Sequence, residues 1–147
     1  GDYHLWQVLV KNDDFYLLDF EGEPESTIRD RKVKQPPLKD VAGIFRSFHY
    51  AVYAAIFNNQ NKYPYALEEL FQAGETLYAY FIGVFMHSYV ELIQQNNINI
   101  GYTQERVYLL EYCMLEKAVY ELGYEMNSRP TWAVIPLRGI LGILNKN

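Results

Sequence analysis

The chain has 147 residues, of which half are apolar and 21% are charged, and its formal net charge is −5. This composition is typical of a globular domain that is long enough to bury a core, and it excludes a disordered chain. The acidic balance argues against nucleic acid as a partner, because a phosphate backbone requires a basic protein face.

The first quarter of the chain predicts a β-hairpin followed by a loop. Residues 4–10 and 15–20 have the composition of short strands, and residues 11–14 between them (Lys-Asn-Asp-Asp) tolerate a tight turn. Residues 21–37 carry many charges and three prolines, which predicts a polar loop.

The remaining sequence predicts helices, because its apolar residues recur at helical spacing. Pro37 suits a first helical turn, and Thr103 suits a helix N-cap. The four predicted helices cover residues 37–59, 64–95, 103–129 and 135–144. The predicted fold class is mainly α, with a small N-terminal β-hairpin and a bundle of long antiparallel helices. We expect one domain over residues 1–147, with its helical part at 38–147.

The most apolar stretch, Leu77 to Ile93, includes His87 and Glu91 and is shorter than the roughly 20 clean apolar residues that a membrane span needs. It therefore predicts a buried amphipathic helix and no membrane partner. The single cysteine, Cys113, allows no internal disulfide, which favours a cytoplasmic location. We expect Cys113 to behave as a small buried apolar residue.

Asp2 and Gln7 have the spacing of a kinase catalytic loop, in which Asp is followed by four residues and then Asn. In kinases this Asp accepts the proton of the attacking hydroxyl and the Asn binds magnesium. Gln offers the same amide oxygen to a hard cation. The pair alone is weak, since such spacing is common by chance.

Asp19 strengthens this interpretation because it ends the second predicted strand. Kinases place a magnesium-binding Asp at this point, so the hairpin is expected to fold Asp19 back beside Asp2 and Gln7. Glu21 lies one pleat period further and is predicted to face the same metal. The competing interpretation is a solvated hairpin with ordinary surface acids.

Five segments, taken together and in order, resemble the maltokinases, which are relatives of the aminoglycoside phosphotransferases. They are Gly-Asp-Tyr-His-Leu-x-Gln-Val-Leu at 1–9, Asp-Phe-Glu-Gly-Glu-Pro at 19–24, Pro-Leu-Lys-Asp-Val-Ala-Gly-Ile-Phe-Arg-Ser-Phe at 37–48, Glu-Lys-Ala-Val-Tyr-Glu-Leu at 116–122 and Arg-Pro-x-Trp-x-x-Ile-Pro-Leu-Arg-Gly at 129–139. Only the segment at 19–24 is specific by itself. Trp6 stands where this family usually has Gly.

The resemblance implies the C-terminal lobe of a kinase that transfers the γ-phosphate of ATP to the anomeric hydroxyl of maltose, giving maltose 1-phosphate. Asp2 would be catalytic, and Gln7, Asp19 and Glu21 would hold Mg²⁺. ATP would bind through an N-terminal lobe that this chain lacks, so the isolated chain is expected to be inactive. The parent is expected to serve trehalose and glycogen metabolism, in some cases fused to trehalose synthase.

On the acceptor side, the resemblance implies that Glu121 and Arg129 bind the sugar, because carboxylate and guanidinium groups hold hydroxyls by directional hydrogen bonds. Tyr120, Tyr124 and Trp132 would either add ring contacts to the sugar or pack in the core. Asp40 matches an Asp of the superfamily's helical core. It is expected to support the catalytic loop or to cap a helix.

Two other functions stay open. One is a kinase for another small hydroxyl substrate, such as an aminoglycoside or choline, although the segments at 19–24 and 129–139 disfavour it. The other is a non-catalytic helical interaction module, for which no magnesium dependence is expected in the parent.

Overall fold

The computed structural model describes residues 2–22, 27–62 and 64–145. It divides into two compact units, one formed by residues 1–47 and 102–147 and the other by residues 48–101, and each is described by itself. Gly1, Glu23 and Pro24, which belong to the motifs at 1–9 and 19–24, lie outside the described residues. The prediction of a single domain over 1–147 stays a prediction.

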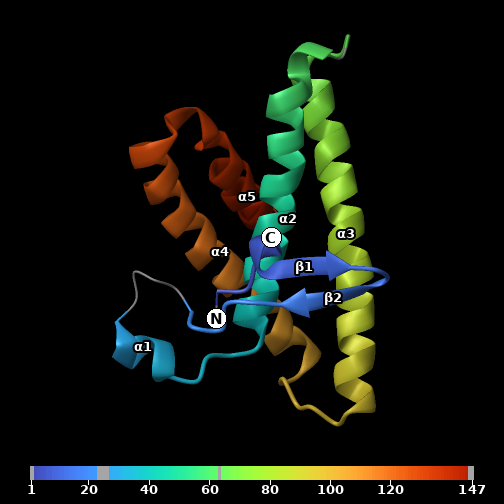
Figure 1. Ribbon diagram of the computed structural model, residues 1–147, viewed down its shortest axis with the longest axis vertical. Helices are drawn as coiled ribbons and strands as arrows, with labels where there is room; N and C mark the ends of the chain where they lie inside the picture. Colours follow the sequence, from blue (N-terminus) through green and yellow to red (C-terminus); the bar gives the residue numbers. More distant parts are fainter. Residues whose placement is uncertain (1, 23–26, 63, 146–147) are drawn as a thin grey trace. The chain divides into compact units, whose positions relative to one another are not determined.

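The predicted fold class is confirmed: a two-stranded hairpin precedes a set of long helices (Figure 1). The elements are η1 (Leu5–Gln7), β1 (Val8–Lys11), β2 (Asp14–Leu17), α1 (Ile28–Lys32), α2 (Leu38–Asn59), η2 (Gln60–Lys62), α3 (Leu67–Gln95), α4 (Thr103–Ser128), η3 (Pro130–Trp132) and α5 (Val134–Leu144).

The hairpin is shorter at its open end than predicted, whereas each strand extends one residue further into the predicted turn. Its strands pair antiparallel from Val8 opposite Leu17 to Lys11 opposite Asp14. The first strand begins late because residues 5–7 form the 3-10 turn η1. The second strand ends early because Asp19 has a φ of 58°, and a left-handed residue interrupts an extended run.

The loop predicted at 21–37 contains a short helix, α1, that the sequence reading missed. Its N-cap is Thr27, whose Oγ1 accepts a hydrogen bond from the backbone N–H of Asp30 at 3.2 Å. The same hydroxyl donates to the Asp30 carboxylate at 2.6 Å. A Thr that precedes an acid by three residues is a known helix-start signal, but five residues are too few to give an apolar periodicity.

The core of the first unit lies where the beginning of α2 meets α4 and α5. Buried residues include Leu38 and Phe45 of α2, Ala118 of α4 and Ile135 of α5. Cys113 is buried as predicted, and burial raises the pKa of its thiol. Apolar burial at this junction fixes the helices that carry the candidate site.

In the second unit, the later half of α2 lies alongside α3 (Figure 1). The rings of Tyr53 and Phe71 stack at a centroid distance of 5.1 Å. Gly74 permits this close packing, because a Cβ there would lie 2.9 Å from side-chain atoms of Val52 and Ile56. The Tyr53 hydroxyl also donates to the Glu75 carboxylate at 2.6 Å.

By length and composition alone, α3 is long and apolar enough to cross a membrane, with a mean hydropathy of 1.2 in its most apolar window. Only 6% of that window is buried within the described structure. The prediction of a buried helix over Leu77–Ile93 is therefore wrong, because Ile93 is the only buried residue of that stretch in the structure. The absence of a membrane partner stays a prediction.

Candidate active site

The segment that carries Asp2 is held against the first half of α2. The backbone N–H of Leu5 donates to Ser47 Oγ at 2.9 Å. A Cβ at Gly43 would lie 2.5 Å from the carbonyl oxygen of Tyr3, so only glycine allows this approach. Trp6, which replaces the usual Gly, lies in η1 outside the positive-φ region and is 91% exposed. Its side chain therefore does not obstruct the loop.

We expect Gly43→Ala to destabilise the chain by about 1–3 kcal/mol, because the added methyl group must displace the Tyr3 carbonyl. Gly123→Ala is the matched control, because Gly123 is also helical and an added Cβ there would have no neighbour within 4 Å. This variant is expected to gain up to ~1 kcal/mol in the free energy of unfolding. Urea unfolding of both variants checks this. Equal stability of the two variants would show that the loop does not rest on α2.

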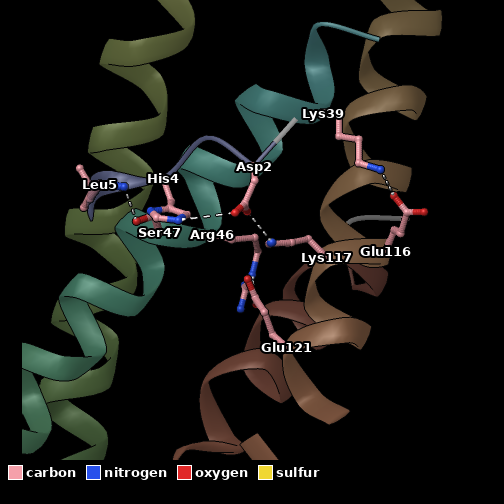
Figure 2. A network of polar contacts seen from close by, with 9 residues as sticks. All are labelled: Asp2, His4, Leu5, Lys39, Arg46, Ser47, Glu116, Lys117 and Glu121. Carbon is pink, nitrogen blue, oxygen red and sulfur yellow. Dashed lines mark hydrogen bonds and ion pairs between the residues drawn. The ribbon is translucent and has the colours of Figure 1, made fainter. Parts of the chain in front are cut away.

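Asp2 lies between two basic side chains (Figure 2). Lys117 of α4 donates to Asp2 Oδ1 at 3.1 Å, and His4 Nε2 lies 3.7 Å from Oδ2. The Asp2 side chain is only 11% exposed. A carboxylate with this burial and a cationic partner is held in one orientation, as a proton acceptor requires.

The predicted convergence of Asp2, Gln7 and Asp19 is present in the structure. The backbone N–H of Leu18 donates to the Gln7 carbonyl at 2.9 Å, which brings the buried Gln7 beside the end of β2. Asp2, Gln7 and Asp19 then line one cavity of about 240 Å³, which we call the metal-side cavity. Asp40, in the first turn of α2, lines it too.

The oxygen groups of this cavity suit Mg²⁺, since an amide and a carboxylate are hard ligands. Among the described residues, no group of three or more His, Cys, Asp and Glu side chains is arranged to hold a metal alone.

A second cavity, of about 480 Å³, adjoins the first and also includes Asp2 and Asp40 in its lining. We call it the acceptor-side cavity. Lys117 and Tyr120 of α4 line it, and its volume falls in the usual range for a small-molecule site. Glu21 lines this cavity rather than the metal-side one, so its predicted role as a metal ligand stays a prediction.

Glu121 is engaged inside the protein. Its carboxylate accepts a hydrogen bond from Arg46 Nε at 2.8 Å, and the two side chains are 13% and 1% exposed (Figure 2). Burial raises the pKa of the Glu121 carboxyl, and the neighbouring Arg46 opposes this shift. Glu121 is absent from the described linings of both cavities, so sugar binding by this residue stays a prediction beside a structural role.

Arg129 is the C-cap residue of α4. It donates to Glu125 from Nε at 3.0 Å and from Nη2 at 2.6 Å, and its guanidinium lies 4.4 Å from the ring centre of Trp132. The described linings of the two cavities do not include Arg129, Trp132 or the half-exposed Tyr124. Their roles in sugar binding also stay predictions.

The sequence reading missed Lys117, which the structure places beside Asp2. The available signal was helical spacing: Lys117, Tyr120 and Glu121 lie three and four residues apart and so share one face of α4. Lys117 also lies 5.4 Å from the ring centre of Tyr120. Charge alone did not single it out, because most lysines lie on solvated surfaces.

If Asp19 binds Mg²⁺, as the resemblance implies, we expect Asp19→Asn in the full-length protein to raise the Mg²⁺ concentration needed for half-maximal activity, because Asn replaces a negatively charged ligand with a neutral one. Asn tolerates the left-handed backbone of this position, so the hairpin should survive. Metal titration with Mg²⁺ and nucleotide checks this. Glu21→Gln is the companion variant: an equally large shift there would assign Glu21 to the same metal. An unchanged metal requirement in Asp19→Asn would contradict the assignment.

The hairpin and the helices match part of the fold of a solved kinase. No model of a known protein family matches the chain. Two solved structures of glucosamine kinase match it with TM-scores of 0.78 and 0.75, both at 20% sequence identity. The first is crystal form B of the enzyme, and the other is a complex with glucosamine, ADP and inorganic phosphate.

The matches cover 99% of this chain but only 33% and 34% of the glucosamine kinase chains. The chain therefore spans about a third of the length of the kinases that it resembles in structure. At this level of identity the likeness shows the shared fold.

Proposed function

We propose that this chain forms the acceptor-side part of an ATP-dependent sugar kinase, with maltose as the acceptor and maltose 1-phosphate as the product. The observation that carries the proposal is the position of Asp2, which lines both cavities. Phosphoryl transfer requires a proton acceptor at the boundary between the metal-bound phosphates and the attacking hydroxyl.

In this proposal Gln7 and Asp19 would hold Mg²⁺, which would supply positive charge to the phosphates of ATP. Asp2 orients the acceptor hydroxyl and takes its proton as the hydroxyl oxygen bonds to the γ-phosphorus of ATP, while the bond from that phosphorus to the bridging oxygen breaks and ADP leaves. The metal-side cavity receives the phosphate end of the nucleotide. The rest of the nucleotide site is expected from the part of the kinase fold that this chain does not span.

The choice of maltose rests on the sequence segments at 19–24, 116–122 and 129–139. A second acceptor, glucosamine, is favoured by the structural likeness to glucosamine kinases. Among the described residues, the acceptor-side cavity is lined by five acids and three bases, so its charge suits an amino sugar as well as a neutral sugar. A fused trehalose synthase and a cytoplasmic location stay parts of this proposal that rest on sequence alone.

The test is phosphate transfer by the full-length protein with ATP and Mg²⁺, using maltose and glucosamine in parallel. We expect maltose to give the higher kcat/KM and its product to carry the phosphate at C1, as judged by ³¹P and ¹³C NMR. A preference for glucosamine would favour the second acceptor. Transfer to neither sugar, with ATP bound, would contradict the proposed function.

A further inference from the structure

We propose that Lys117 is a positioning residue for Asp2, holding its carboxylate at the boundary of the two cavities. This inference rests on the proposed function and adds a residue to it. The contact joins two distant parts of the sequence: Asp2 precedes the hairpin, and Lys117 lies in the middle of α4 (Figure 2). The ammonium-to-carboxylate distance is 3.1 Å.

A loop carboxylate needs such a support. Asp2 belongs to no helix or strand, so the secondary structure alone does not fix its side-chain orientation. Lys117 is 28% exposed and Asp2 only 11%, so their contact is screened less than a surface ion pair. A proton acceptor that is misplaced by about 1 Å can lose on the order of 100-fold in rate.

Lys117 is itself fixed by its surroundings. It lies 5.4 Å from the ring centre of Tyr120, on the face of α4 that lines the acceptor-side cavity. One helical turn further, the buried pair of Glu121 with Arg46 joins this face of α4 to α2. The same part of α2 carries Ser47, which holds the backbone of Leu5. Both sides of the Asp2–Lys117 contact are therefore anchored on α2.

The experiment is a double-mutant cycle in the full-length protein, with kcat measured at saturating ATP and maltose. We expect Lys117→Met to lower kcat on the order of 100-fold with little change in the KM for ATP. In an Asp2→Asn background, the same substitution should change kcat by no more than about twofold, because its route of action has already been removed. Lys62→Met, on the exposed turn η2, is the control and should keep normal activity.

A normal kcat in Lys117→Met overturns the proposal. So does a further large loss on adding it to Asp2→Asn, since Lys117 would then act on the substrate rather than through Asp2. If the Met variant does not fold, Lys117→Arg takes its place in the same cycle, with an intermediate kcat expected. The activity of the unmodified protein separates the two proposals. If the unmodified protein transfers no phosphate to sugar, the proposed function has failed. If it is active and the Lys117 variants give either contradicting result, only the role of Lys117 is rejected.

Discussion

Asp2→Asn is expected to remove most phosphoryl transfer while leaving the fold and the binding of ATP intact. The amide is nearly isosteric, and its oxygen can still accept the hydrogen bond that Lys117 donates to Oδ1 at 3.1 Å. It cannot accept the proton of the sugar hydroxyl. General-base assistance is typically worth about 10²–10⁴-fold in rate, so we expect a loss of this size in kcat rather than in KM.

Steady-state kinetics of the full-length protein measure this effect, and circular dichroism checks the fold. Asp13→Asn, in the exposed hairpin turn, makes the same chemical change outside both cavities and should behave as the unmodified protein. A kcat within a few-fold of normal in Asp2→Asn would reject Asp2 as the base. The convergence of Asp2, Gln7 and Asp19 would then need another explanation.

Glu121→Ala is expected to destabilise the protein by about 3–5 kcal/mol, because it removes the carboxylate that pairs with the buried Arg46 guanidinium. Arg46 is 1% exposed and approaches α5 closely: a Cβ at Gly139 would clash with its guanidinium. The charge therefore has little room to turn towards water. Replacing both partners, as Arg46→Met with Glu121→Leu, should recover much of the loss, since apolar side chains of similar volume carry no desolvation cost.

Urea unfolding of the three variants gives these free energies. Glu116→Ala is the matched control, because Glu116 also lies on α4 and pairs with Lys39 of α2 at 3.5 Å, but these two side chains are 48% and 35% exposed. It should cost no more than about 1 kcal/mol. If Glu121→Ala unfolds like this control and instead raises the KM for maltose, Glu121 serves the sugar, as the resemblance to maltokinases implies.

Local sequence signals located the hairpin and the long helices well. Strand composition, a turn of Lys-Asn-Asp-Asp and apolar helical spacing are each read over a few neighbouring residues. The boundaries were harder. The early end of β2 at Leu17 depends on the left-handed backbone of Asp19, and α1 depends on one Thr27 cap over five residues. Neither feature produces a periodic pattern.

The grouping of Asp2, Gln7 and Asp19 around one cavity was predictable for a similar reason. A hairpin of known length returns the chain to its starting point, so the positions of Asp2, Gln7 and Asp19 follow from the sequence between them. The position of Glu21 was not predictable in this way, because Glu21 lies beyond the paired strands. It lines the acceptor-side cavity.

The sequence by itself determined the mainly α fold class, the hairpin and the grouping of Asp2, Gln7 and Asp19, because all of these depend on short-range geometry. Only the tertiary structure decided which side chains of α4 face Asp2 and which face α2. Lys117 and Glu121 lie one helical turn apart in the same sequence segment, yet one lines a cavity and the other pairs with buried Arg46. That division depends on how α2, α4 and α5 pack together. The Arg46–Glu121 contact joins residues that are 75 positions apart in the sequence, and the Asp2–Lys117 contact joins residues that are 115 positions apart. Contacts over such separations leave no periodic pattern in a single sequence.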